Sequence, residues 1–409
     1  MSIFIKKIRP EDLSIPTKTE LNLHKLNRYL SLQILAAIVM GTLCGVCFPK
    51  LSMGMQWVGT SFVTVIEPFV PPVIFLSIVS LFGSMENLRL AGRITIRALV
   101  YFILVSSTAI IFGICCGLLI KPGRIDRTFL ETISPPKVEE SNYHEWLNVV
   151  LQNSMLIILV LAIVIGLFIN QYKYRNKVLV VIDRIKLILL KLLRYLFLLA
   201  PVITFCGIAY TVGRYGLETL VPIGKMLAGT YISMFLFVFT VLASLLAAFK
   251  VNIFVFLGTI KDELLYAMGT SSSSSVIPLL MEKLEGLGLK QPVVRLVTVT
   301  GNSLNLNGTC IYLGISVMFL AQLNNVSFTF SELCNIVLII LLTSKGASGI
   351  PGTGFLALVT TVSSIHKIPV EGLAVLLSID RFMSEARAIT NTIGHSVAAL
   401  VVSKLKNSP

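Results

Sequence analysis

Residues 369–404 read PVEGLAVLLSIDRFMSEARAITNTIGHSVAALVVSK, and this stretch decides the fold of the chain. It is long enough to cross a bilayer as one helix, for which about 20 residues suffice. Polar residues recur along it at helical spacing: Asp380, Ser384, Arg387, Asn391 and His395. Their intervals of 4, 3, 4 and 4 residues place them within a stripe about 80° wide on a helix. We therefore predict a membrane-embedded helix with one polar face.

Arg387 is the most informative residue of this stripe. An arginine at the centre of a membrane span costs roughly 2.5–3.5 kcal/mol on insertion scales, so it is either paired within the protein or binds an anion. A permanent partner on the same helix is not obvious, because Asp380 is two turns away and Glu385 points to another side. The planar guanidinium matches a carboxylate or a phosphate. We favour a substrate anion, and the internal ion pair stays open.

The composition places this helix in an all-α polytopic membrane protein. Hydrophobic residues make up 55% of the 409 and charged residues 13%, about half the usual share of a soluble domain. The mean hydropathy is +0.86. A block with several charged residues at its start, the fifth of six, is predicted to begin as an amphipathic piece at the membrane surface. The six predicted spans of the first half are 31–48, 60–83, 95–120, 147–170, 179–212 and 221–249.

The net charge of +14 does not come from one basic patch. Basic residues flank the apolar blocks in the alternation typical of the positive-inside rule, which predicts that both termini lie in the cytoplasm. This placement argues for membrane lipid and against nucleic acid as a partner. The first 30 residues contain no cleavable apolar stretch, so we expect no signal peptide. The seven cysteines lie in or beside apolar blocks and indicate helix packing rather than a disulfide or metal framework.

After about residue 251, small polar residues interrupt the apolar sequence three times, at 269–275, 301–309 and 346–354. Backbone groups unwound in lipid each cost several kcal/mol, so a broken helix persists only against protein or a water-filled cavity. Breaks at corresponding positions around a central broken helix are the sequence sign of a transporter's midplane site. We therefore predict a secondary transporter whose site lies in the second half.

Four segments in a fixed order carry a resemblance to a known family. They are Ser271–Ser275 followed by Pro278, Asn305-Leu-Asn-Gly-Thr309, Gly349-Ile-Pro-Gly-Thr-Gly354 and Asp380–Asn391. Together they resemble the dicarboxylate/amino acid:cation symporter family, the family of the glutamate transporters. The resemblance is strongest to its bacterial C4-dicarboxylate carriers. It runs from about residue 28 to 404 and is densest after Glu263.

The resemblance implies eight transmembrane helices plus two re-entrant helical hairpins, arranged as inverted repeats in a homotrimer. A transport domain then moves like an elevator against a fixed scaffold. The hairpins would centre on Ser272 and Ser273 and on 350–354, and the seventh helix would break at 305–309. The implied parts are a cytoplasmic segment 1–30, transmembrane helices 1–6 over 31–250, a transport core over 251–404 and a cytoplasmic tail 405–409.

The resemblance also implies a substrate site in which Arg387 holds the distal carboxylate. Ser384 stands where amino acid carriers of the family have a carboxylate, and Ala388 where they have a threonine. A buried ammonium would lack a partner there, which favours succinate, fumarate or malate, with glutamate or aspartate as the alternative. The implied substrate-binding residues are Ser272, Ser273, Thr309, Gly352, Ser384, Arg387 and Asn391.

The cation side departs from the family pattern. Asn307 replaces an aspartate, His395 stands where an aspartate or asparagine is usual, and Phe102 and Val105 replace tyrosine and threonine. We expect H⁺ and/or Na⁺ as the coupling ion, no cofactor, and no metal other than Na⁺. His395 is either a proton-coupling group or a neutral packing residue bonded to Asn307 or a carbonyl. The candidate cation-coupling residues are Ser106, Gly301, Asn305, Asn307, Asp380 and His395.

Two other function classes fit parts of the sequence. The segment 346–349 resembles the nucleophile motif of rhomboid proteases, with Ser348 as nucleophile and His395 as a conceivable base. Short motifs of small residues recur by chance, and the chain has more spans than such an intramembrane hydrolase needs. The missing cation carboxylates instead allow a transporter-like protein that has lost its coupling, acting as a uniporter, a sensor or a binding partner. We favour a symporter, not an enzyme, in the cell inner membrane.

Overall fold

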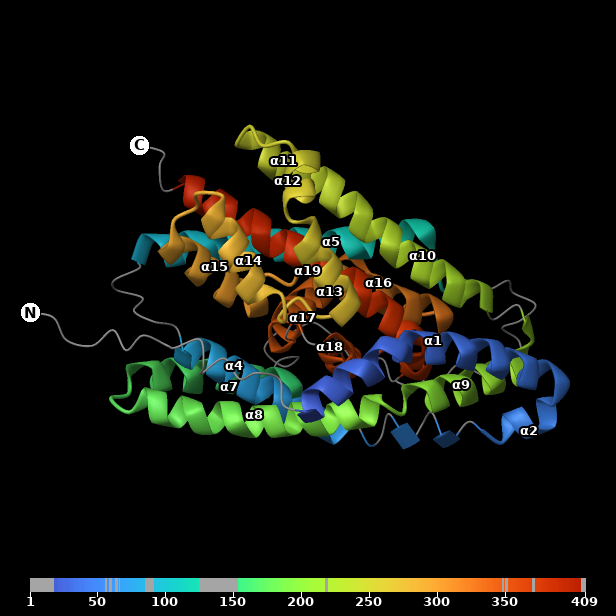
Figure 1. Ribbon diagram of the computed structural model, residues 1–409. Coiled ribbons are helices and arrows are strands. Elements are labelled where there is room, and N and C mark those ends of the chain that lie inside the picture. Colours follow the sequence, from blue (N-terminus) through green and yellow to red (C-terminus); the bar gives the residue numbers. More distant parts are fainter. Residues whose placement is uncertain are drawn as a thin grey trace, which may run out of the picture.

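Every regular element in the described part of the chain is helical. The computed structural model describes residues 18–55, 57–58, 61–62, 65, 67–84, 92–124, 154–217, 220–347, 349, 352–369 and 372–405. Figure 1 shows the helices in two groups that lie side by side along the length of the molecule. Residues 1–17 of the predicted segment 1–30, residues 406–409 of the predicted tail 405–409, and most of the loop before the fourth predicted span lie outside the described residues.

The first group contains helices from the first half of the chain. Helix α1 packs along α9, and α4 packs on α7 and α8. Glycines bring these helices close: a Cβ at Gly45 of α1 would lie 2.8 Å from the Cβ of Val212 on α9. Its members are α1 (Lys18–Cys47), α2 (Pro49–Met53), α4 (Val70–Ser84), α7 (Ser154–Gln171), α8 (Arg175–Phe197) and α9 (Ala200–Tyr215).

The second group is built around α16 and α19, which pack on each other and on α5. Residues 307–321 of α16 are all buried, so this helix is the centre of the group. Its members are α5 (Gly92–Ile120), α10 (Leu220–Phe237), α11 (Ala243–Ala248), α12 (Ile253–Thr259), α13 (Lys261–Thr270), α14 (Ile277–Gly286), α15 (Gln291–Leu304), α16 (Asn307–Leu323), α17 (Phe330–Gly346), α18 (Thr353–Ile365) and α19 (Leu373–Leu405).

The predicted spans 95–120 and 221–249 match helical segments to within a few residues, 31–48 covers the last part of α1, and the described residues of 60–83 and 147–170 are also helical. The fifth span, expected as one helix over 179–212, differs. The chain instead ends α8 at Phe197 and begins α9 at Ala200. Pro201 stands in the first turn of α9, where its missing N–H is tolerated, but inside a continuous helix it would remove a hydrogen bond. The charged first piece is therefore a separate helix.

Three helices are long and apolar enough to cross a membrane among the described residues, at Ile96–Ile120, Leu220–Ala248 and Gln291–Leu323. The third contains the break between α15 and α16 at Asn305 and Leu306. Helices α17 and α18 pack against each other and also touch α4 of the first group. The breaks at residues 271–273 and at Asn305 and Leu306 are buried, so they lie against protein, where unwound backbone is tolerated.

Candidate functional site

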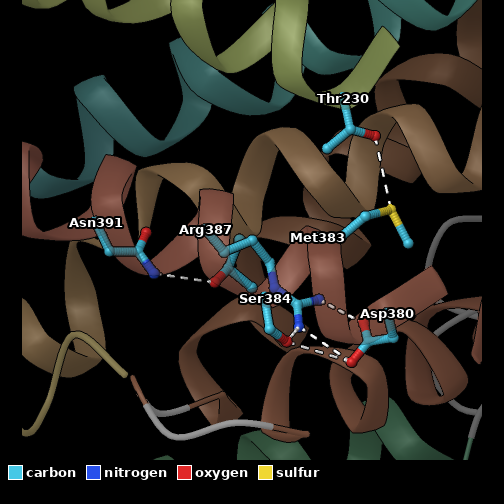
Figure 2. A network of polar contacts seen from close by, with 7 residues as sticks. Thr230, Asp380, Met383, Ser384, Arg387 and Asn391 are labelled. Carbon is cyan, nitrogen blue, oxygen red and sulfur yellow. Dashed lines mark hydrogen bonds and ion pairs between the residues drawn. The ribbon is translucent and has the colours of Figure 1, made fainter. Parts of the chain in front are cut away.

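The polar stripe of α19 is buried along its whole length. Asp380, Ser384, Arg387 and Asn391 are each 3–4% exposed, and His395 is fully buried. The helix predicted over 369–404 is present as Leu373–Leu405. Figure 2 shows Asp380, Ser384 and Arg387 as one cluster, with Asn391 further along the same helix.

Arg387 forms an ion pair with Asp380. Its Nη1 lies 2.9 Å from Asp380 Oδ1 and its Nη2 lies 3.2 Å from Oδ2, and Nη2 also donates to the Ser384 hydroxyl. The expectation that Asp380 is too distant for such a pair is wrong. Residues seven apart return to the same helix face, and a long side chain points back toward the N-terminus. Arg387 can therefore reach Asp380 across two turns.

The guanidinium keeps part of its hydrogen-bonding capacity. Among the described residues, three of its five N–H donors go to Asp380 and Ser384, which leaves two for a ligand. Its carbon lies 4.1 Å from the ring centroid of Tyr312 on α16, a cation–π contact that fixes its plane. A Cβ at Gly354 would lie 2.8 Å from Nη1, so only glycine lets α18 approach so closely.

Asn391 joins α19 to the first turn of α16. Its Oδ1 accepts from the Gly308 amide at 2.8 Å, and its Nδ2 donates to Thr309 Oγ1 at 3.3 Å. A Cβ at Gly308 would lie 2.8 Å from the Arg387 carbonyl oxygen. The break before Asn307 thereby places the start of α16 beside the arginine.

The N-termini of two helices, α16 and α18, lie beside Arg387. Helix α16 begins at Asn307, and α18 begins at Thr353 after Gly352, whose φ of 86° is left-handed and favours glycine. The first amides of a helix have no intrahelical partner, and the N-terminal end carries partial positive charge. With Arg387 they make a surrounding suited to an anion.

The serines between α13 and α14 meet the turn between α17 and α18. Gly349 O accepts from Ser272 Oγ at 2.7 Å and from the Ser274 amide at 3.2 Å. Ser273 is 1% exposed, and its hydroxyl has no hydrogen-bond partner among the described residues. Gly349 and Gly354 are five residues apart, so the intervening turn leads from these serines to Arg387. Ile350 and Pro351 of that turn lie outside the described residues.

Three buried side chains of the cation candidates have polar atoms without a hydrogen-bond partner among the described residues. Asn305 donates to Gly394 O at 3.0 Å, but its own Oδ1 is unpaired in the described structure. Both polar atoms of Asn307 and both ring nitrogens of His395 are likewise unpaired there. The bond from His395 to Asn307 that the packing interpretation invoked is not formed. Unpaired buried polar groups are costly and call for a ligand or water.

The chain matches the sodium:dicarboxylate symporter family over residues 30–405. It belongs to this family. A C4-dicarboxylate transport protein of Bacillus subtilis strain 168 is 35% identical over 399 residues, covering 94% of this chain and 95% of that protein. One of Deinococcus radiodurans is 37% identical over 401 residues, covering 94% and 90%. One of Aeromonas salmonicida is 36% identical over 398 residues, covering 93% of each.

Family membership makes the chain a transporter and not an enzyme, as the four motifs predicted. The hydrolase alternative is thereby excluded, and its nucleophile Ser348 lies outside the described residues. Of the predicted substrate residues of this symporter, the structure brings Thr309, Ser384, Arg387 and Asn391 together. Ser272 and Ser273 contact Gly349, five residues before the Gly354 that lies against Arg387.

One charged residue of the symporter was missed by sequence reasoning. Lys345, near the end of α17, donates to Leu304 O at 2.7 Å and to Ser106 Oγ at 2.9 Å. Ser106 was predicted to bind a coupling cation, and Gly301 one turn before Leu304 packs near His395. The signal was present: Lys345 directly precedes a break in an apolar helix, where a charge at membrane depth indicates function.

Proposed function

We propose that this symporter imports a small C4 dicarboxylate of the succinate, fumarate and malate class. The observation that carries the proposal is the buried guanidinium of Arg387, which keeps two N–H donors beside the starts of α16 and α18. Both oxygens of Asp380 are already bonded to Arg387, so this carboxylate is not available to an amino acid's ammonium group. The relatives' names point to the same substrate class.

The charges of the site give a physical reason for cation coupling. Asp380 and Arg387 neutralise each other, and an ionised dicarboxylate brings two further negative charges. Burying those charges without compensation costs several kcal/mol each. A cation that enters with the substrate removes this cost, and the unpaired oxygens of Asn305 and Asn307 support a place for it. The coupling ion is H⁺ and/or Na⁺.

The two helical groups support an elevator mechanism. Every proposed substrate residue belongs to the second group, around α16 and α19, and none belongs to the first group. We assign the second group as the transport domain and the first as the scaffold. In this proposal the protein has eight transmembrane helices and two re-entrant hairpins. It forms a homotrimer in the cell inner membrane with both termini in the cytoplasm.

Uptake of labelled succinate and aspartate into proteoliposomes tests the function, with Na⁺ and H⁺ gradients imposed separately. We expect succinate uptake driven by at least one gradient and abolished in Arg387→Ala. Removing one partner of a buried charge pair costs about 2–5 kcal/mol of binding free energy, so affinity should fall at least about 30-fold. Arg387→Lys is the matched control, because it keeps a positive charge beside Asp380 but lacks the fork.

Three outcomes would contradict parts of this proposal. Equal succinate uptake by Arg387→Ala would refute the role of Arg387. Preference for aspartate would make the chain an amino acid carrier, and counterflow exchange that no ion gradient drives would make it a uniporter.

A further inference from the structure

The Lys345 ammonium lies in a small cluster of oxygen atoms where three helices meet. Nζ is 2.7 Å from Leu304 O on α15 and 2.9 Å from Ser106 Oγ on α5. The Ser106 hydroxyl in turn donates to the same carbonyl at 3.2 Å. Lys345 itself comes from α17, so one side chain connects three elements.

These oxygen atoms have the character of a cation site. Leu304 is the last residue of α15, and since the chain breaks at Asn305 its carbonyl has no partner further along the helix. The C-terminal end of a helix carries partial negative charge, and half-helix C-termini coordinate cations in transporters. Ser106 is fully buried, so its hydroxyl oxygen is shielded from water.

Lys345 has no carboxylate within 4.0 Å in the described part of the chain. Among the described residues its hydrogen-bond partners are this carbonyl and this hydroxyl, oxygen atoms of the kind that also coordinate a bound metal ion. We infer that Lys345 is a tethered cation that fills this site in place of a free Na⁺. The inference rests on the proposed function and names part of its coupling machinery.

Two consequences follow from a tethered cation. Lys345 itself connects α17 to the end of the broken helix α15, so this contact does not depend on Na⁺ from solution. While it is protonated, the ammonium also gives the transport domain a positive charge, which offsets one of the two charges of the substrate. Fewer free cations are then needed to compensate each dicarboxylate.

Two substitutions at Lys345 separate this role from packing. Lys345→Ala vacates the site and leaves Leu304 O and the Ser106 hydroxyl free for Na⁺. Lys345→Met fills the same volume with an apolar chain. Purified protein is assayed for its melting temperature and for succinate affinity by calorimetry, across a Na⁺ series balanced with choline. Lys261→Met, an exposed lysine at the start of α13, is the control.

We expect Lys345→Ala to bind succinate at least about tenfold more weakly without Na⁺, because charge-assisted hydrogen bonds are lost. Na⁺ should restore its affinity and raise its melting temperature more than it does for wild type. Lys345→Met should be weakened equally but not restored, and Lys261→Met should match wild type. The inference is overturned if Lys345→Ala responds to Na⁺ no more than wild type, or if Lys345→Met responds equally.

Two further measurements keep the test decisive. Ser106→Ala keeps the ammonium and removes one partner, so it should lower the melting temperature without creating Na⁺ dependence. A new Na⁺ dependence in Ser106→Ala would overturn the inference. The melting temperatures need no substrate, so they test Lys345 even if wild-type protein binds no succinate, a result that would contradict the proposed function alone.

Discussion

Arg387 is bonded to Asp380, and a substrate carboxylate must share the guanidinium with that residue. Asp380 neutralises the guanidinium through two hydrogen bonds, and the ring centroid of Tyr312 lies 4.1 Å from its carbon. A bound carboxylate therefore meets an arginine whose charge is already balanced, and the acidic partner opposes the anion. The strength of substrate binding at this residue is set by the difference between these two effects.

Replacing Asp380 by Asn should separate the attraction of the substrate by Arg387 from its repulsion by Asp380. The variant keeps the shape of the side chain but leaves Arg387 without a counter-charge, which destabilises the empty protein. Succinate then supplies the missing charge, so we expect a lower melting temperature without succinate and a larger rise on adding it. Thermal unfolding with and without succinate measures both.

Glu385→Gln is the matched control for this prediction. It makes the same change of charge on α19 at a side chain paired with Arg381 rather than Arg387. A succinate-induced rise in Asp380→Asn no larger than in wild type would show that Asp380 does not oppose the substrate.

At the scale of elements, the site depends on how closely broken helices approach α19. The first turn of α16 lies against the α19 backbone at Gly308, and α18 begins beside Arg387 at Gly354. Both contacts need a residue without a side chain, because a Cβ would meet backbone or guanidinium atoms closer than 3.0 Å. The glycines therefore position two helix N-termini at the site.

Gly308→Ala should disturb the site through this packing. The added Cβ would lie 2.8 Å from Arg387 O and 3.0 Å from its Cα, so α16 must move away from α19. Overpacking of this kind costs about 1–3 kcal/mol of unfolding free energy. We expect a lower melting temperature and weaker succinate binding, because Asn391 and Thr309 lose their alignment.

Gly258→Ala in α12 is the control, since a Cβ there meets nothing within 4 Å. Gly258 lies in the last turn of α12, so the gain in stability should be smaller than in a helix interior, where it is about 0.5–1 kcal/mol. Unchanged stability and binding in Gly308→Ala would contradict the close approach of α16 and α19.

Sequence patterns predicted the elements better than their contacts. The stripe of α19 and the breaks around Ser272, Asn305 and Gly352 could be predicted, because polar residues are costly at membrane depth and are rarely kept there without a role. The division of the fifth span could have been found from Pro201. The Asp380–Arg387 pair and the place of Lys345 could not, because long side chains reach across turns and between helices that only the fold brings together.

At the scale of the molecule, the two helical groups meet where α19 packs on α1 and α9, and also where α17 and α18 touch α4. Phe382 of α19 packs against Ile34 of α1 and Ala200 of α9. If one group slides past the other during transport, these contacts must separate in each cycle. The boundary between the groups is then the place where motion can be stopped without touching the substrate site.

A cross-link across this boundary should stop transport and spare binding. We expect Ile34→Cys with Phe382→Cys, in a background without the native free cysteines, to lose uptake after treatment with a short bismaleimide. Succinate affinity should stay within about threefold of wild type, a free-energy change under about 0.7 kcal/mol. Uptake and calorimetry on the same sample measure both.

The control pair lies inside the first group, where Ser80 Oγ is 2.7 Å from Asp183 Oδ1. Cross-linking Ser80→Cys to Asp183→Cys should leave uptake unchanged. Full uptake by the cross-linked Ile34–Phe382 pair would mean that the two groups do not move apart there.

The shared acceptor at Gly349 bears on the direction of transport. Ser272 and Ser274, between α13 and α14, both donate to this single carbonyl, which lies between α17 and α18. Moving either of these two segments away from the other breaks the same two hydrogen bonds, each worth about 0.5–1.5 kcal/mol net. These bonds therefore add equally to the barriers for release to either side, and they favour neither import nor export. In such a carrier the ion and substrate concentrations on the two sides decide the direction, and reversing them should turn uptake into efflux.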